Sequence, residues 1–390
     1  MKGVEPRARG VAVRLAAFYG AVFALIGVQL PFWPVWLEAR GLNAGEIGLV
    51  IAAAFWPRVI TSLVIPHRVD QLGAPHRAMV VLSAMTLAGI ALFAIAEGFW
   101  SIMALSLLTG ATFAAILPLG EAVALQEVHE HQISYGRVRL WGSITFIAAA
   151  IAAGRWLEQS GPEAAWLLLV VTAGLTVAAC LAMPRRRGAP TERAPRLRQL
   201  LAQPGLIAFV LAAGLIQASH VVYYGFATLH WRAAGHGEGV IGWLWAEGVL
   251  AEIVLFAFAA TLLGRMTPAR VLALAGGLSV VRWGATALST DLAVLVPAQA
   301  LHAASFGAVH LATMKHLREQ TPPALLASAQ GFYAAIGGAL LSGLITPLGG
   351  WHFGRAGGDA FWAMAGIALI GTLLALRLTQ RYSVAQRSSR

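Results

Sequence analysis

The stretch LPLGEAVALQEVHEHQISYGRVRLWGSITF, residues 117–146, joins two apolar runs through a polar turn. The first run carries the carboxylate of Glu121, and the second begins with Arg137 and Arg139. A charge inside hydrocarbon costs roughly 2.5–3.5 kcal/mol on insertion scales, so such a residue usually faces a cavity or a partner. A Glu late on one spanning helix and an Arg early on the next can lie at similar depth. The stretch therefore predicts a charged site inside a helical membrane protein.

Composition indicates the same class for the whole chain of 390 residues. Hydrophobic residues make up 58% and charged residues 12%, whereas about 25% charged is usual for soluble domains. Apolar runs of about 20 residues, long enough to cross a roughly 30 Å hydrocarbon core, recur along the chain. We predict an all-α membrane protein with twelve transmembrane helices, at residues 12–36, 46–65, 77–96, 99–125, 136–157, 164–183, 205–231, 240–263, 268–288, 291–314, 324–348 and 359–379.

The distribution of basic residues predicts an orientation. The formal net charge is +11. If both termini are cytoplasmic, most of the 28 Lys and Arg residues lie in the termini and in the loops on that side. This bias is the positive-inside rule, so the charge indicates a membrane and not a nucleic-acid partner. We expect a multi-pass protein of a bacterial-type inner (plasma) membrane with both termini cytoplasmic.

Several other classes are disfavoured by the sequence. The first apolar run is too long for a cleavable signal peptide. The single cysteine, Cys180, excludes an intrachain disulfide and a multi-cysteine metal site. The sequence contains no GxxxxGK[ST] and no HExxH motif, so we expect neither ATP-driven transport nor a zinc site. We predict no cofactor and no metal, and we find no clustered nucleophile and base that would indicate an enzyme.

A polar connection at residues 184–204, rich in Pro and Arg, is expected to be a cytoplasmic linker. It separates a predicted N-terminal six-helix bundle, residues 1–183, from a C-terminal six-helix bundle, residues 205–390. The two halves align without gaps when GLNAGEIG is placed on GHGEGVIG, which puts Arg58 opposite Glu252. Chance similarity of apolar segments could mimic this repeat. Paired repeats around a central site are a known transporter plan.

The charged residues of the first half have two interpretations. Glu121 and Arg139 could pair within the membrane, or both could lie at the headgroup level, which long side chains reach easily. Arg58 lies about twelve residues into the second run, directly after Pro57, whose ring removes a backbone hydrogen bond. Arg58 could form a structural ion pair or belong to an anion or coupling site.

The second half carries Glu247 and Glu252 in one apolar run. Counted from the predicted outer surface, Glu247 and Arg282 lie at similar depth, as do Glu252 and His302. These matched depths suggest the pairs Glu247–Arg282 and Glu252–His302. Buried carboxylates and imidazoles can carry a proton near neutral pH, so these four residues are candidates for proton coupling. Static charge neutralisation between helices is the alternative.

The segment QASHVVYYGF places His220 in mid-span with Tyr223 and Tyr224 nearby. This combination suits a polar aromatic ligand. A single histidine on a helix is also a common hydrogen-bonding residue in packed interiors, so both interpretations stay open.

Asp70, Gly73 and Arg77 in the segment PHRVDQLGAPHR resemble the loop between helices 2 and 3 of the major facilitator superfamily. Pro66 and Gln71 depart from that loop's pattern. Further segments are similar to the 3-phenylpropionate/proton symporter branch of the superfamily: QLPFWPVWL (29–37), YGRVRLWGS (135–143), SHVVYYGF (219–226), VVRWG (280–284) and LHx₇Hx₄K (301–315).

More distantly, the chain resembles the lactose permease family. Glu121 and Arg139, eighteen residues apart, match that family's substrate-binding Glu and Arg of helices 4 and 5. Arg282 and His302, twenty apart, match its helix 9 Arg and helix 10 His, and Lys315 follows as its Lys does. These matches imply a major facilitator fold, usually monomeric.

One position departs from the lactose permease family. That family has a proton-carrying Glu three residues after its helix 10 His, and here the residue is Ser305. A proton would therefore need another group, and we expect Glu252 first and Glu247 second, with His302 assisting.

We predict a secondary transporter that works by alternating access and imports a small aromatic carboxylate with protons. Arg139 or Arg58 would hold the carboxylate, and Trp and Tyr side chains the ring. The alternatives are symport of a sugar or nucleoside, with Glu121 and Arg139 binding hydroxyls, and export of a drug or metabolite.

Overall fold

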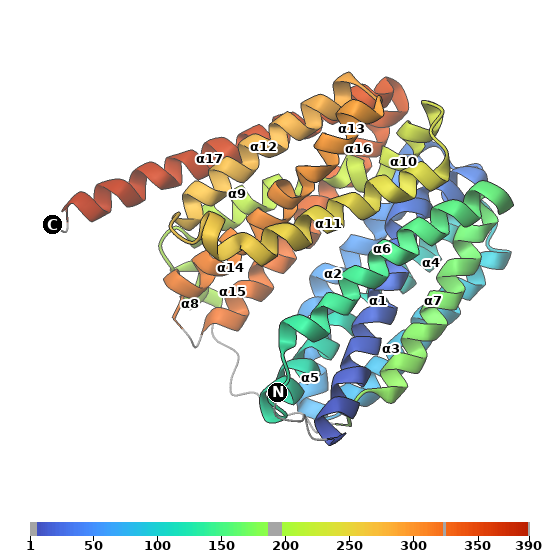
Figure 1. Ribbon diagram of the computed structural model, residues 1–390, viewed down its shortest axis with the longest axis horizontal. Helices are drawn as coiled ribbons and strands as arrows, with labels where there is room; N and C mark the ends of the chain where they lie inside the picture. The colour runs from blue at the N-terminus through green and yellow to red at the C-terminus, as the bar shows by residue number, and fades with distance from the viewer. Residues whose placement is uncertain (1–5, 186–196, 323–324, 389–390) are drawn as a thin grey trace. The chain divides into compact units, whose positions relative to one another are not determined.

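The protein is described by a computed structural model at residues 6–185, 197–322 and 325–388. All regular elements in these ranges are helices, which confirms the all-α prediction (Figure 1). Eleven helical segments of the described chain are long and apolar enough to cross a membrane. The predicted class, a multi-pass membrane protein, is therefore confirmed.

The chain divides into two compact units. Unit 1 comprises residues 1–192 and 235–246, and unit 2 comprises residues 193–234 and 247–390. The boundary after residue 192 falls in the segment predicted as a linker, much of which lies outside the described residues. Helix α11 (Glu238–Leu263) begins in unit 1 and ends in unit 2. Nothing in the apolar run at residues 240–263 indicates that one helix is shared between the units.

Unit 1 is built around α1 (Pro6–Ala39), which packs along α6 and α7 (Figure 1). A second group of contacts joins α2 to α4, and α3 to α4 and α7. Side chains from α1, α3, α5, α6 and α7 form one buried apolar core. The remaining helices are α2 (Ala44–Leu72), α3 (Pro75–Leu92), the 3₁₀ turn η1 (Phe93–Ile95), α4 (Gly98–Phe113), α5 (Ile116–Glu130), α6 (Tyr135–Ser160) and α7 (Glu163–Ala182).

Glycines set how closely the helices of unit 1 approach. Membrane helices associate through close packing, since lipid is as apolar as their side chains. A Cβ atom on Gly27 would lie 2.7 Å from the carbonyl oxygen of Phe146, and one on Gly110 would lie 2.6 Å from the Cα of Ala54. Any larger residue would push these helices apart.

Unit 2 has its own core, formed mainly by α9, α12, α14, α15 and α17. Helix α12 lies along α17, and α9 packs against α17 and η4 (Figure 1). The elements of this half are α8 (Leu197–Leu201), α9 (Leu206–Ala218), α10 (Val221–Ala233), α12 (Pro268–Leu288), α13 (Leu292–Ala300), the π-helix η2 (Ala303–Ala308), α14 (Val309–Gln320), α15 (Leu326–Tyr333), the π-helix η4 (Ala334–Leu340), α16 (Leu341–Ala356), the 3₁₀ turn η5 (Gly357–Asp359) and α17 (Ala360–Ser388).

Two spans of unit 2 are interrupted near their middle. Between α9 and α10, the side chains of Ser219 and His220 bond to backbone carbonyls one turn earlier, which competes with regular helix bonding. The α13–α14 span contains Pro297 and then the π-helix η2. Such π-helical turns often accompany functional sites. These two interruptions bring His220 and Ser305 together.

The last apolar segment, Ser328–Gln380, is 53 residues long. Gly357 ends α16 with a positive φ of 55°, a conformation that favours glycine. The 3₁₀ turn η5 follows before α17 begins. One crossing needs about 20 residues, so this segment is long enough for two.

Candidate functional site

Glu121 of α5 is held by two tyrosines of unit 1. The hydroxyl of Tyr19, on α1, donates to Glu121 Oε2 at 2.7 Å, and the hydroxyl of Tyr135, at the start of α6, donates to Oε1. Tyr19 is fully buried, while Glu121 and Tyr135 are half-buried. Both carboxylate oxygens therefore have a donor without any cation.

Arg139 of α6 lies against aromatic faces in the same cluster. Its guanidinium carbon is 4.1 Å from the ring centroid of Phe23 and 5.4 Å from that of Tyr19. A Cβ on Gly142, one turn later, would lie 3.0 Å from Arg139 Nη1, so glycine leaves room for the guanidinium. Glu121 and Arg139 share Tyr19 but form no ion pair within 4 Å in the described structure. The expected direct pairing is therefore not found.

The backbone of α5 presents Glu121 toward α1. Helix α4 ends at Phe113, five residues before Pro118, whose ring obstructs the carbonyl of residue 114. A Cβ on Gly120 would lie 2.0 Å from the ring of Phe18. Phe18 packs edge-on against Tyr19 with centroids 5.5 Å apart. Gly120 thus lets α5 approach α1 closely enough for the Tyr19 bond.

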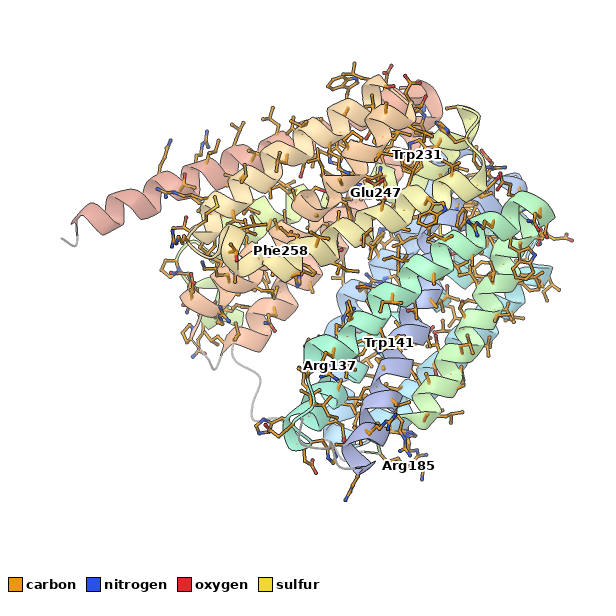
Figure 2. The ribbon with its side chains drawn as sticks, in the orientation of Figure 1. Arg137, Trp141, Arg185, Trp231, Glu247 and Phe258 are labelled. Atoms are coloured by element: carbon orange, nitrogen blue, oxygen red, sulfur yellow. The ribbon has the colours of Figure 1, made fainter. Side chains whose placement is uncertain are left out.

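Arg58 of α2 is half-buried. Its guanidinium lies 5.6 Å from the ring centroid of Phe55, and its Nε is buried without a hydrogen-bond partner in the described chain. Arg58 belongs to unit 1 and Glu252, its counterpart in the proposed repeat, to unit 2. The roles predicted for Arg58 remain predictions. Arg137 is exposed on α6 (Figure 2), in keeping with a position near the turn.

Arg282 of α12 is the centre of a second cluster, in unit 2, and is fully buried. Its Nη1 donates to His302 Nδ1 at 3.0 Å and to Ser305 Oγ at 2.9 Å, and its Nη2 donates to Gln299 Oε1 at 3.1 Å. The guanidinium also interacts with Tyr223, which in turn interacts electrostatically with Glu247. Arg282 Nε and Gln299 Nε2 are buried without a hydrogen-bond partner among the described residues.

Aromatic rings enclose the Arg282 guanidinium. Its carbon lies 4.6 Å from the ring centroid of Tyr223 and 4.4 Å from that of Trp283, distances at which a cation is attracted to a ring face. Trp283 donates in turn to Ser219 at 2.9 Å. The cluster is a buried cation between rings, with neutral hydrogen-bond acceptors.

His220 joins this cluster through Ser305. Its Nε2 lies 3.1 Å from Ser305 Oγ, and its ring packs against Trp283, His302 and Tyr224 with centroids 4.9, 5.7 and 5.7 Å away. The prediction that His220 lies with Tyr223 and Tyr224 is thus met in the geometry. Their role in binding a ligand remains a prediction.

Glu247 and Arg282 form no ion pair among the described contacts, and the pairing of Glu252 with His302 stays a prediction. His302 directs Nδ1 to Arg282 and packs against the backbone of Gly248, where an added Cβ would be 3.3 Å from His302 Cβ. Glu252 lies over η2, its Cγ 3.2 Å from a Cβ built on Gly307. Glu247, labelled on α11 in Figure 2, is half-buried and has no ion pair within 4 Å in the described ranges. Matched depth does not fix which way a side chain turns around its helix.

Sequence reasoning missed several members of both clusters. Tyr19 and Phe23 lie in an apolar run without a charge near them in sequence. Tyr135 stands in the segment YGRVRLWGS, which indicates a family resemblance but not a contact with Glu121. Gln299 is the one of these residues that the sequence could have indicated as part of a site, because an amide in the apolar run VPAQALH needs a hydrogen-bond partner inside hydrocarbon. Among the described residues, no group of three potential metal ligands is found.

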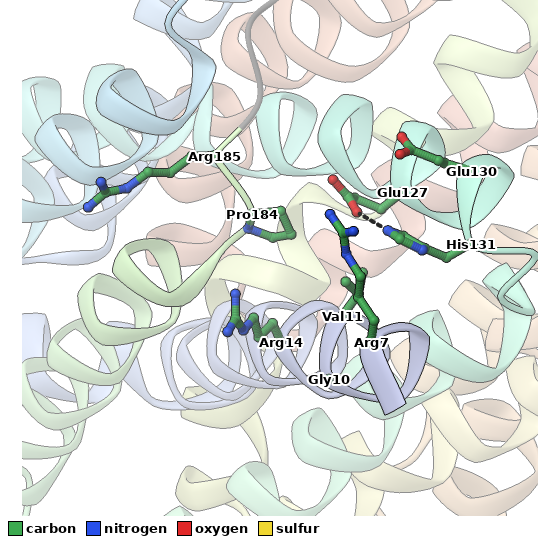
Figure 3. A pocket seen from close by; sticks show the side chains of 9 residues that line it. All are labelled: Arg7, Gly10, Val11, Arg14, Glu127, Glu130, His131, Pro184 and Arg185. Atoms are coloured by element: carbon green, nitrogen blue, oxygen red, sulfur yellow. Dashed lines mark ion pairs between the residues drawn. The ribbon is translucent and has the colours of Figure 1, made fainter. Parts of the chain in front are cut away.

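A cavity of about 590 Å³ lies at one end of unit 1, between the start of α1, the end of α5 and the segment after α7 (Figure 3). His131 and Glu127 form an ion pair at 3.3 Å on its wall. Exposed arginines, among them Arg7 and Arg14, line the opening. The predicted loop motif with Asp70, Gly73 and Arg77 stays a prediction, because the side chain of Asp70 lies outside the described residues.

Comparison with known proteins gives the family. The model of the MFS_1-like family matches residues 12–364. A probable 3-phenylpropionic acid transporter of Escherichia coli is 30% identical over 91% of this chain and 94% of its own. The maltose permease of Geobacillus stearothermophilus is 30% identical over 93% of each chain.

Solved structures agree on the fold. The crystal structure of the nucleoside transporter NupG superposes with a TM-score of 0.78, at 15% identity, over 95% of this chain and 99% of that one. The peptide-family transporter PepTSo gives a TM-score of 0.74 at 10% identity, over 97% and 99%. These relatives and neighbours are membrane transporters, not enzymes. The chain therefore belongs to the MFS_1-like family of the major facilitator superfamily and is a multi-pass membrane transporter of small molecules.

Proposed function

We propose that this transporter carries a small aromatic carboxylate together with a proton by alternating access. The observation that carries the proposal is the buried cation Arg282, whose hydrogen-bond acceptors His302, Ser305 and Gln299 are all neutral. A buried charge without a counter-charge is costly. An anion that enters the cluster would remove that cost.

The geometry of Arg282 suits a carboxylate. A guanidinium binds carboxylate oxygens through directed N–H donors, and Arg282 Nε and Gln299 Nε2 are two buried donors that lack a partner in the described chain. The sequence had favoured Arg139 or Arg58 for this role. We propose Arg282 in their place, because it is fully buried while both of the others are half-buried.

The rings around the cluster suit the aromatic part of the substrate. Tyr223, Trp283 and His220 are buried within it, and aromatic pairs contribute about 0.5–1.5 kcal/mol beyond the area they bury. The Escherichia coli relative, named a probable 3-phenylpropionic acid transporter, supports the same substrate class. For unit 1, taken by itself, we propose that Arg139 and Glu121, with Phe23 beside them, also bind substrate groups.

We place the proton on a titratable side chain of unit 2. The candidates are His220, His302, Glu247 and Glu252. We further propose a monomer with twelve crossings, counting residues 328–380 as two, and with both termini in the cytoplasm of a bacterial-type cell.

Uptake into proteoliposomes tests the proposal. Labelled 3-phenylpropionate is expected to accumulate when the outside is acidic, and a protonophore is expected to abolish the accumulation. Two matched competitors separate the parts of the ligand: 3-phenylpropionamide lacks the charge and 3-cyclohexylpropionate lacks the aromatic ring. Both are expected to compete more weakly than 3-phenylpropionate. The proposal is contradicted if 3-phenylpropionate uptake is the same with and without the proton gradient, or if 3-phenylpropionamide competes as well as 3-phenylpropionate.

A sugar or nucleoside is the second candidate substrate. Glu121 with its two tyrosine hydroxyls is a hydrogen-bonding group suited to hydroxyl ligands, and one relative is a maltose permease. A thermal-shift panel of sugars, nucleosides and aromatic acids separates the two candidates, because only the true class raises the unfolding temperature. Efflux of the hit from intact cells against its gradient would instead indicate an exporter.

A further inference from the structure

We infer that His220 is the residue that takes up the coupled proton, and that it does so when the substrate carboxylate binds Arg282. This inference rests on the proposed function and assigns its proton site. It differs from the expectation from sequence, which placed the proton on Glu252 or Glu247. The argument depends on the direction of the hydrogen bonds around Ser305.

The direction is fixed at both ends of a short chain of bonds. His220 Nδ1 lies 3.2 Å from the carbonyl oxygen of Ile216 and 3.0 Å from that of Gln217. Carbonyl oxygens only accept, so Nδ1 carries the hydrogen. At the other end, Arg282 Nη1 donates to Ser305 Oγ at 2.9 Å, because a guanidinium only donates.

Ser305 therefore donates its own hydrogen to His220. With the Arg282 bond on its oxygen, the Ser305 hydroxyl can point to His220 Nε2 at 3.1 Å. His220 is then neutral, with Nε2 as a free acceptor for a proton. Ser305 stands between the imidazole and the guanidinium and couples them.

This chain can reverse when a proton arrives. A protonated His220 would donate from Nε2 to Ser305 Oγ, and the Ser305 hydrogen would turn to the carbonyl oxygen of His302, 3.5 Å away. Ser305 would keep its bond from Arg282. A hydroxyl rotation is thus all that the hydrogen-bond network requires.

The neighbouring imidazole lacks this freedom. His302 Nδ1 accepts directly from Arg282 Nη1 at 3.0 Å. A proton on that nitrogen would place two donors against each other and break the bond. His302 is better suited to hold Arg282 in place than to take up the proton.

The charges near His220 explain why its uptake of a proton would depend on substrate binding. Arg282 of α12 is a cation that shares Ser305 with His220, and its positive charge disfavours a second positive charge on the imidazole. Tyr223 and Tyr224 lie beside the ring on α10, and they interact electrostatically with Glu247 and Glu252 of α11. A bound carboxylate would cancel the Arg282 charge and so favour protonation.

The site would then have the same net charge in both states. Empty, it holds one positive charge, on Arg282. Loaded, it holds Arg282, a carboxylate and protonated His220, which again sum to one positive charge. The empty and loaded carriers would meet similar electrostatic barriers as they change conformation, so one proton would move with each anion.

The test measures protons bound with ligand. Isothermal titration calorimetry of the full-length protein with 3-phenylpropionate, in two buffers of different ionisation enthalpy, gives the number of protons taken up. Wild type is expected to take up about one proton, so its affinity falls about tenfold per unit rise in pH over the pH range in which calorimetry detects that uptake. His220→Gln is expected to lose this uptake and slope; its affinity should fall, because the His220 ring belongs to the proposed binding cluster, but it should stay measurable.

Matched variants decide between His220 and its neighbours. His302→Gln and Glu252→Gln are expected to keep proton uptake, while Ser305→Ala is expected to reduce it, because His220 loses its link to Arg282. Binding of 3-phenylpropionate by His220→Gln also shows that the variant is folded. Substrate counterflow should survive in that variant, while uphill accumulation is lost.

Each outcome has a separate meaning. If His220→Gln still takes up a proton, or if uptake is lost only in Glu252→Gln or His302→Gln, the assignment to His220 is wrong while the proposed substrate class stands. If wild type binds 3-phenylpropionate without a proton, His220 has no coupling role. If wild type binds no carboxylate, the proposed function fails first and the assignment falls with it.

Discussion

Arg139 in unit 1 and Arg282 in unit 2 both lie over two aromatic rings, and they differ in what else their clusters hold. The cluster of Arg139 contains Glu121, whose oxygens are already bonded by two tyrosines. The cluster of Arg282 contains only neutral acceptors among the described residues. In the first cluster a carboxylate lies beside the arginine, and in the second the groups that accept from the arginine are uncharged side chains.

The two clusters also differ in burial. Arg282 is fully buried, and Arg139 is half-buried. Electrostatic interactions are much weaker where water screens them. An anion should therefore gain more from Arg282 than from Arg139, although both arginines have a similar aromatic surrounding. Burial and uncharged hydrogen-bond acceptors, and not the presence of arginine alone, distinguish the proposed anion site.

The largest expected effect on ligand binding comes from substituting the two arginines. Arg282→Gln should weaken 3-phenylpropionate binding by about 100-fold or more, because hydrogen bonds to charged groups contribute about 1.5–3 kcal/mol each and 1.4 kcal/mol is tenfold. Arg139→Gln should weaken it by about tenfold at most. Calorimetry on both variants measures the difference, with the exposed Arg137→Gln as control. Equal losses at 139 and 282 would remove the distinction between the clusters.

A second prediction adds a carboxylate directly beside Arg282. Ser305→Glu should place an internal anion beside Arg282 and compete with the ligand, so 3-phenylpropionate binding should fall by about tenfold to 100-fold. Ser305→Ala, which adds no charge, should leave binding within about fivefold. Because Ser305 is fully buried, thermal unfolding of each variant serves as the folding control. Ser305→Glu that binds the ligand as wild type does would mean that Arg282 does not receive it.

The sequence was enough for the membrane class and the positions of the helices, because apolar run length depends on bilayer thickness alone. It also identified Arg282, His302 and His220 as unusual, since charged and polar groups in hydrocarbon are rare. Position along a helix gives depth. It does not give the rotation of a side chain about the helix axis, which depends on packing with other helices.

That limit explains the pairs that were not found. Glu247 and Arg282 lie at matched depth, yet Arg282 turns toward α13 and η2, where Pro297 and a π-helix alter the helical register. The residues that hold Arg282 are Gln299 and Ser305, which carry no charge and gave little signal. Similarly, Glu121 is satisfied by tyrosine hydroxyls, so the spacing of Glu121 and Arg139 did not predict their contacts. The packing of the helices against one another determines the contacts of Arg282 and those of Glu121.

A third, smaller effect is expected from Glu121→Gln. The amide keeps an oxygen acceptor for one tyrosine but presents N–H donors to the other, so the cluster in unit 1 loses a charged acceptor. We expect a loss of about 1–3 kcal/mol in stability and only a few-fold change in 3-phenylpropionate binding. Thermal unfolding and calorimetry measure the two. A sugar-binding protein would instead lose hydroxyl-ligand affinity strongly, which would favour the second candidate substrate.

The smallest single effects should come from the two tyrosines, and their combination tests how the cluster is satisfied. Tyr19→Phe and Tyr135→Phe each remove one donor to Glu121 and leave the other, so each should cost about 0.5–1.5 kcal/mol of stability. The double variant leaves a half-buried carboxylate without either donor and should cost more than the sum, because neighbouring deletions in one network are not additive. Thermal unfolding of the cycle measures this coupling.

The same cycle in a Glu121→Gln background is the control, since the coupling should shrink once the charge is gone. Tyr19→Phe also keeps the ring that lies under Arg139, so any larger effect at Tyr19 than at Tyr135 would come from the hydroxyl and not from the cation–ring contact. Additive losses in wild type would mean that Glu121 finds another donor. In that case Arg139, which contacts the ring of Tyr19, is a candidate donor, and unit 1 would hold a flexible ion pair.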